Sequence, residues 1–145
     1  FRYYNQRYGY ERGDQMIKLV GRVLDAVSQR DLDFLGHVGG DDFVMLMQSG
    51  DWERRLREAL ELFRVNATAL FSDEDLARGA LLVEDRRGAV REMPLASLAI
   101  GVVGVPGGAP LSHVEVAAAA HDARQQAKKT GGNALFVERR RLVEA

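Results

Sequence analysis

Apolar residues recur at helical spacing in two stretches of the chain, which predict helices at about 14–27 and 52–63, and an alanine-rich stretch predicts a third at about 113–129. Each stretch follows a residue whose side-chain oxygen can accept backbone N–H bonds as a helix cap. These candidate caps are Asp14, Asp51 and Ser112. The third helix is rich in alanine and ends at a run of threonine, glycine and asparagine.

Short apolar runs between the helices predict strands, at about 34–38, 43–47, 80–84, 89–93, 95–103 and 134–138. Tight polar turns at 39–42 and 85–88 indicate two hairpins. Residues 65–78 predict an irregular connection with room for one short helix. Because helices and strands are interspersed, we expect an α+β (or α/β-type) sandwich, in which a sheet is packed against helices.

Composition narrows the class of protein. The chain has 145 residues, which suits one domain, and 46% of them are apolar. Its formal net charge of -1 gives no general attraction to nucleic acid or to an anionic membrane, so we expect neither as a partner. There are no cysteines, which excludes disulfides and thiolate metal sites and agrees with a cytoplasmic location. The most apolar segment, 95–111, is too interrupted by glycine and proline to span a bilayer.

The first hairpin turn carries the strongest candidate chemistry. Gly39 and Gly40 are followed at once by Asp41 and Asp42. Glycines let backbone N–H groups approach phosphate oxygens, since no side chain intervenes. The two carboxylates that follow can hold Mg²⁺, which prefers oxygen ligands. Taken alone, the turn is by default an ordinary hairpin connection.

Four segments in register decide between these interpretations. They are FRYYNQRYGYERGDQMI, RDLDFLGHVGGDDFVML, LASLAIGVV and AKKTGGNALFV. In order and spacing they resemble the GGDEF domain, the diguanylate cyclase family of bacterial signalling, over nearly the whole chain. The resemblance implies one domain over 1–145, with a central, mostly antiparallel sheet flanked by helices, similar to nucleotidyl cyclase and polymerase palm domains. It also implies an enzyme that joins two GTP molecules into cyclic di-GMP and releases two pyrophosphates.

By this resemblance, each residue of the site has an expected role. Gly39 and Gly40 would face the phosphates, and Asp42 would bind Mg²⁺ in a two-metal site. Asp41 would bind metal or help to deprotonate the attacking hydroxyl. The remaining substrate contacts are Asn5 and Asp14 toward guanine, and Arg2 and Lys128 toward the terminal phosphates.

A second resemblance concerns Arg30 and Asp33, which are separated from Gly39 by the spacing of the family's RxxD motif. In the family this motif binds cyclic di-GMP and inhibits the enzyme. An arginine fork suits phosphate oxygens and the guanine O6/N7 edge, and aspartate suits the opposite edge of guanine. Without the other motifs, the same residues would read as a solvated helix end.

The chain departs from the family pattern at the metal site. The family usually has glutamate where this chain has Asp42, whose side chain is shorter by about 1.5 Å. The family's other metal-binding aspartate, and the first strand that carries it, would lie upstream of Phe1. We therefore expect these 145 residues to be a fragment of a longer multidomain protein that lacks its first strand here.

Several residues also admit a purely structural interpretation. Asn5 could be a turn residue, and Lys128 a last-turn lysine favoured by the helix dipole. The charged run 53–58 reads as a solvated helix face, or as a second inhibitory contact. His113 and His121 are too far apart along one helix to share a zinc ion.

The functional hypothesis is therefore a diguanylate cyclase domain that works as a homodimer, each half holding one GTP with Mg²⁺. It would be attached to a sensory or effector domain and inhibited by its own product. The alternative is a catalytically degenerate domain that binds cyclic di-GMP or GTP and regulates its neighbour.

Overall fold

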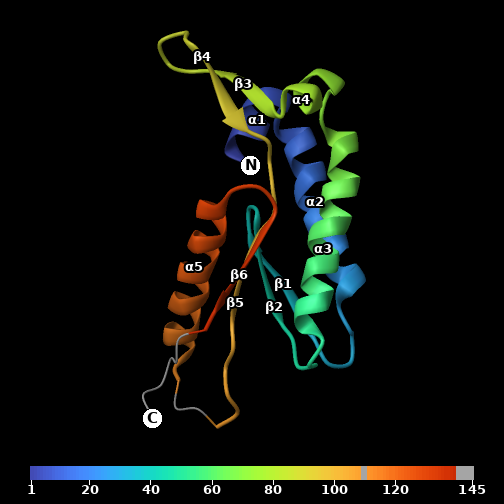
Figure 1. The fold of residues 1–145 in the computed structure, drawn as a ribbon, viewed down its shortest axis with the longest axis vertical. Helices are drawn as coiled ribbons and strands as arrows, with labels where there is room; N and C mark the ends of the chain where they lie inside the picture. The colour runs from blue at the N-terminus through green and yellow to red at the C-terminus, as the bar shows by residue number, and fades with distance from the viewer. Residues whose placement is uncertain (109–110, 140–145) are drawn as a thin grey trace. The chain divides into compact units, whose positions relative to one another are not determined.

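The computed structural model describes residues 1–108 and 111–139, and the chain divides into two compact units after Ser97 (Figure 1). The first unit contains α1 (Arg2–Tyr8), α2 (Tyr10–Val27), β1 (Phe34–Gly39), β2 (Asp42–Leu46), α3 (Trp52–Ala67), the 3₁₀ turn η1 (Thr68–Leu70), α4 (Asp73–Arg78), β3 (Ala80–Glu84) and β4 (Val90–Pro94). The second contains β5 (Ala99–Val103), α5 (His113–Thr130) and β6 (Ala134–Glu138).

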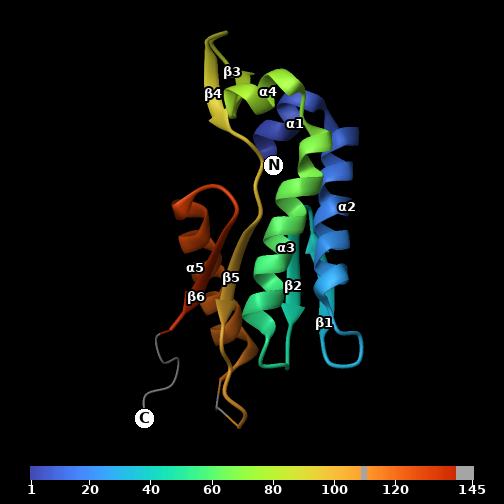
Figure 2. The same ribbon diagram turned by 45° about the vertical axis from the view of Figure 1, so that its right-hand side comes forward.

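Two long helices, α2 and α3, run side by side and supply most of the core of the first unit (Figure 2). Apolar side chains at helical spacing face each other across this contact. The buried ones are Met16, Leu19, Val20, Val23, Leu24 and Val27 on α2, and Leu56, Ala59, Phe63 and Ala67 on α3. The hydrophobic pattern of the sequence therefore predicted the packed faces correctly.

The strands of the first unit form two antiparallel hairpins. In the β1–β2 hairpin Phe34 pairs with Leu46 and His37 with Phe43, and the register shifts between His37 and Gly39. This irregularity precedes the turn at Gly40 and Asp41. The second hairpin pairs Ala80 with Pro94 and closes on the predicted turn at 85–88.

A buried carboxylate joins the start of the chain to α4. The Asp75 side chain is 0% exposed, and it accepts hydrogen bonds from Tyr8 Oη, from Arg7 Nε at 3.3 Å and from Arg78 Nη1 at 2.8 Å. Beside it, Tyr4 Oη donates to the Leu70 carbonyl at 2.6 Å. These bonds hold α1 against the segment that follows α3.

The second unit is a strand–helix–strand arrangement. β5 and β6 are parallel, and α5 packs on both of them. The approach of α5 to β5 is close, because a Cβ atom at Gly101 would lie 2.2 Å from the backbone nitrogen of Arg124. Ala123 and Ala127, both fully buried, form the helix face of this contact. These two alanines of α5 thus serve packing, whereas Ala117 and Ala118 are exposed.

The structure confirms the predicted α+β class, and the described strands pair in three two-stranded ladders. It also corrects four details. α1 was missed, and α2 begins at Tyr10 after Gly9, so Asp14 lies inside the helix and does not cap it. β5 begins at Ala99 instead of position 95. Asp51 does precede α3, but its carboxylate binds Ser49 and two arginines instead of backbone N–H groups.

Among the described residues, no helix combines the length and the apolar character that crossing a membrane requires.

We predict that Asp75→Asn lowers the free energy of unfolding by about 2 kcal/mol, because charge-assisted hydrogen bonds to a buried group are lost. The Tyr8 hydrogen bond, helped by the Arg7 guanidinium, holds the pKa of Asp75 below its ordinary value. The carboxylate therefore stabilises the fold above about pH 4, and this contribution is lost as the pH falls through the lowered pKa. Urea unfolding of both proteins at several pH values checks this.

The matched control is Asp73→Asn, since Asp73 is exposed on the same helix and should matter by less than about 0.5 kcal/mol. A difference between parent and Asp75→Asn that stays constant from pH 7 to pH 3 would contradict the prediction.

Candidate functional site

The turn between β1 and β2 leaves its backbone open. Gly39 and Gly40 have φ angles of 154° and 53°, conformations that side-chain-bearing residues rarely adopt. No heavy atom lies within 4 Å of the place where a Cβ would stand on either residue. Both glycines are exposed. The turn can therefore receive a ligand against its main chain.

The His37 side chain stabilises the conformation of this turn. Its Nε2 lies 2.7 Å from the carbonyl oxygen of Gly40, and its ring stacks on Phe43 with centroids 4.4 Å apart and an interplanar angle of 11°. Because His37 and Phe43 are paired across the hairpin, the stack and the hydrogen bond fix the same short segment. The turn is thus shaped before any ligand arrives.

Two carboxylates follow the glycines. Asp41 is exposed, with 49% of its side chain accessible, and its Oδ2 lies 4.0 Å from the backbone nitrogen of Phe1. Asp42 is half-buried as the first residue of β2. The start of α1 therefore lies beside the turn, which brings Arg2 into the same region. Arg2 is exposed, and its guanidinium lies 6.0 Å from the Tyr3 ring centre.

A metal site is only partly assembled. Within the described ranges, no group of three or more histidine, aspartate or glutamate side chains could hold a metal ion. Asp41 and Asp42 are two adjacent carboxylates at one turn. That pair suits a Mg²⁺ ion that keeps water and phosphate among its ligands, since magnesium is commonly held by one or two carboxylates.

Asn5 is held in a narrow space between α1 and α2. Its Oδ1 is buried and has no hydrogen-bond partner among the described residues. A Cβ atom at Gly13 would lie 1.7 Å from that oxygen, so the glycine makes room for the amide. Asp14, the next residue on α2, is exposed. An unpaired buried acceptor is costly unless a donor reaches it, which makes Asn5 a candidate ligand contact.

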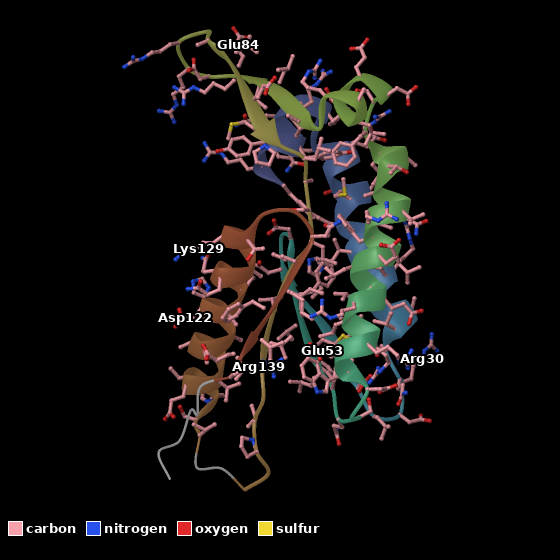
Figure 3. The ribbon with its side chains drawn as sticks, viewed as in Figure 1. Arg30, Glu53, Glu84, Asp122, Lys129 and Arg139 are labelled. Carbon is pink, nitrogen blue, oxygen red and sulfur yellow. The ribbon has the colours of Figure 1, made fainter. Side chains whose placement is uncertain are left out.

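Lys128 belongs to the second unit, where it is exposed in the last turn of α5 next to Lys129 (Figure 3). The first unit therefore contains the turn together with Arg2, Asn5 and Asp14. Lys128 is the predicted site residue that belongs to the second unit.

The loop after α2 places Arg30 and Asp33 in opposite environments. Arg30 is exposed and projects outward beside the end of α2 (Figure 3). The Asp33 side chain is 0% exposed. It accepts hydrogen bonds from the backbone N–H groups of Gln29 at 2.8 Å and Gln48 at 3.4 Å, and from Arg55 Nη1 at 2.5 Å.

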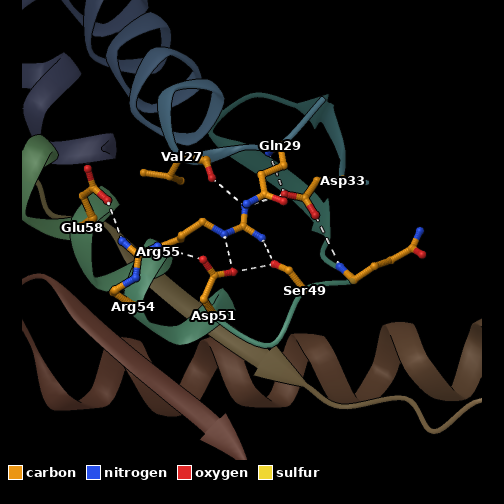
Figure 4. A network of polar contacts seen from close by, with 9 residues as sticks. Val27, Gln29, Asp33, Ser49, Asp51, Arg54, Arg55 and Glu58 are labelled. Atoms are coloured by element: carbon orange, nitrogen blue, oxygen red, sulfur yellow. Dashed lines mark hydrogen bonds and ion pairs between the residues drawn. The ribbon is translucent and has the colours of Figure 1, made fainter. Parts of the chain in front are cut away.

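Arg55 is the functional candidate that the sequence interpretation missed. It is only 4% exposed, and its guanidinium bridges three segments of the chain (Figure 4). Besides Asp33, it binds the Val27 carbonyl at 2.7 Å, Asp51 Oδ1 at 3.1 Å and the Ser49 hydroxyl. The prediction that 53–58 is a solvated helix face is therefore wrong at this position. The sequence did indicate the burial of Arg55, because this residue lies on the apolar face of the helix, four residues before Ala59 and eight before Phe63.

The charges of this cluster reinforce each other. The Arg55 hydrogen bond, followed by the Gln29 N–H, lowers the pKa of Asp33. In turn, the bond to Asp33 raises the pKa of Arg55. The Ser49 hydroxyl and then the Arg54 guanidinium lower the pKa of Asp51 to about 2. All three groups are thus charged at neutral pH.

Comparison with known proteins identifies the family. The sequence model described as "Diguanylate cyclase, GGDEF domain" matches residues 1–78, more than half of the chain. The chain therefore belongs to the GGDEF family of diguanylate cyclases, which are nucleotidyltransferases that make cyclic di-GMP. No curated protein and no solved structure matches it. The matched region includes the turn, Asn5, Asp14, Arg30 and Asp33, and ends before Lys128.

We predict that Gly13→Ala displaces the Asn5 side chain without unfolding the protein. The new Cβ would collide with Asn5 Oδ1, but this is the end of a flexible side chain that can rotate away. Alanine inside a helix is also favoured over glycine by up to about 1 kcal/mol. We expect a large shift of the Asn5 side-chain amide resonances, with unfolding free energy unchanged or slightly higher.

Gly50→Ala is the control, because nothing lies within 4 Å of its Cβ position. Unmoved Asn5 resonances in Gly13→Ala, or a protein destabilised by more than about 2 kcal/mol, would show that Asn5 and Gly13 do not compete for this space.

Proposed function

We propose that this chain is a diguanylate cyclase domain, which condenses two GTP molecules into cyclic di-GMP and two pyrophosphates. The observation that carries the proposal is the exposed turn of Gly39 and Gly40, with its open backbone and its two following carboxylates. Such a turn can surround phosphate oxygens with N–H donors, and membership of the GGDEF family supplies the reaction class.

Each side chain of the site has a part to play in binding one GTP. The Gly39 and Gly40 amides would donate to phosphate oxygens, and Arg2 and Lys128 would meet the terminal phosphates. The unpaired Asn5 Oδ1 would accept a hydrogen bond from the guanine edge. The exposed Asp14 carboxylate would accept further donors of guanine.

Asp41 and Asp42 would hold magnesium that arrives with the triphosphate. When bound, the metal neutralises phosphate charge and orients the reacting groups. Asp41, the more exposed carboxylate, is also free to take the proton of the attacking 3′-hydroxyl. The family resemblance implies one further metal-binding aspartate besides these two carboxylates.

The reaction requires two copies of the domain, because each 3′-hydroxyl attacks the α-phosphate of the GTP held by the other copy. We therefore propose a homodimer whose assembly is set by an attached sensory or effector domain. We further propose that all 145 residues form one GGDEF domain, and that its product inhibits it by binding at Arg30 and Asp33.

One observation favours a second candidate, a binding domain without catalysis. Asp42 replaces the family's glutamate, and its carboxylate extends about 1.5 Å less far. Magnesium tolerates little variation in its ligand distances. A site with this shortened ligand could bind GTP or cyclic di-GMP and still fail to align the reacting atoms, which would make the domain a regulatory module.

The decisive experiment incubates the full-length protein with GTP and Mg²⁺ and separates the products by chromatography. We expect cyclic di-GMP from the parent and none from Asp41→Asn. Asp42→Glu should raise the rate about ten- to a hundredfold, because a displacement near 1 Å costs about that factor in catalysis.

Glu84→Gln, on the surface of β3, is the control and should leave the rate unchanged. Absence of product from both the parent and Asp42→Glu at high protein concentration, together with measurable GTP binding, would replace the enzyme by the binding module. Whether the domain is an enzyme or a binding module, Gly13→Ala should weaken GTP binding, because it displaces the Asn5 side chain that is proposed to bind guanine.

A further inference from the structure

The product site proposed above contains one residue that a ligand cannot reach in this conformation. The Asp33 side chain has no exposed surface, whereas Arg30 is open to solvent. A cyclic dinucleotide could therefore meet the Arg30 guanidinium at once. Its guanine edge would still be shut off from the Asp33 carboxylate.

Asp33 is also fully occupied. Its Oδ2 accepts from the Gln29 N–H and from Arg55, and its Oδ1 accepts from the Gln48 N–H. The charge-assisted bond to Arg55, at 2.5 Å, is the shortest of the three. Charge-assisted bonds are about twice as strong as neutral ones, so a guanine edge would have to displace the strongest partner of this carboxylate.

Arg55 can give up Asp33 without losing every partner. The Val27 carbonyl, Asp51 and Ser49 would still bind its guanidinium. Asp51 remains as a negative charge at 3.1 Å from Arg55 Nε. A buried arginine left without any carboxylate would be strongly destabilising, but one that keeps Asp51 is tolerable. The cluster thus has an alternative arrangement in which only the Asp33 bond is broken.

We propose that Arg55 is a latch on the product site, a positioning residue that holds Asp33 away from ligand until cyclic di-GMP competes for it. The proposal rests on the function proposed above, because it concerns the regulation of the site formed by Arg30 and Asp33. In the closed state Asp33 binds Arg55. In the open state Asp33 faces guanine, and the loop 28–33 is released from the start of α3.

The latch lowers the apparent affinity for cyclic di-GMP by the fraction of molecules in which it is open. Product inhibition would then begin only at higher product concentration. Opening would free the loop that carries Asp33, while the Val27 carbonyl at the end of α2 stays bonded to Arg55 on α3.

The first test measures cyclic di-GMP binding to the full-length protein by calorimetry. Arg55→Gln removes the charged fork and frees Asp33, so we expect binding about tenfold tighter than in the parent. Arg64→Gln is the matched control, because Arg64 is exposed on the same helix and pairs only with Glu61 among the described residues. It should bind like the parent. Equal or weaker binding by a folded Arg55→Gln overturns the latch.

The second test needs no substitution and decides the matter if Arg55→Gln does not fold. The Gln29 and Gln48 amides donate to Asp33, so opening the latch should expose them. We expect saturating cyclic di-GMP to speed their hydrogen exchange in the parent. Unchanged or slower exchange of both amides would mean that ligand binds with the latch closed, and the proposal fails.

Arg30→Ala separates this proposal from the one on which it rests. If Arg30→Ala abolishes binding but Arg55→Gln does not strengthen it, the product site stands and only the latch is wrong. If neither the parent nor Arg55→Gln binds cyclic di-GMP, or if Arg30→Ala binds like the parent, the product site itself is wrong, and the latch falls with it.

Discussion

The position of the β1–β2 hairpin, which carries the glycine turn, depends on the buried Arg55 guanidinium. A charge that is 4% exposed must be paired, and its partners come from three places in the chain: the end of α2, the loop before β1, and the β2–α3 connection. The hairpin that carries the glycine turn starts from that loop and ends at that connection. One side chain therefore fixes the open end of the hairpin, where β1 starts and β2 ends.

The other end of the hairpin is fixed by different means. His37 bonds to the Gly40 carbonyl and stacks on Phe43, so the turn keeps its shape although no side chain covers it. The start of α1 lies beside the same turn, and α1 is anchored in turn by the buried Asp75. An exposed, glycine-rich backbone is thus supported by a rigid frame, the arrangement that places ligand-binding loops in many folds.

Sequence reasoning succeeded where local chemistry decides the outcome. The helices α2, α3 and α5, the two antiparallel hairpins and the Ser112 cap were all predicted. It failed at two helix starts, where nearby residues override the capping preference of an aspartate. Asp14 was a plausible cap, yet α1 and Gly9 place the helix start earlier. Asp51 precedes a helix as a cap should, yet Arg55 and Ser49 claim its carboxylate.

The sequence by itself determined the family and the chemistry of the turn, because spacing and residue type are properties of the chain alone. Gly39 and Gly40 need no partner to leave the backbone open, and Asp41 and Asp42 are carboxylates in any fold. Only the tertiary structure decided which charged residues are available. Arg30 and Asp33 are near neighbours in sequence, but the buried Arg55, 22 positions after Asp33, withdraws one of them from solvent. The burial of Asp33 is set by this contact with a distant segment, which the residues around Asp33 in the sequence do not encode.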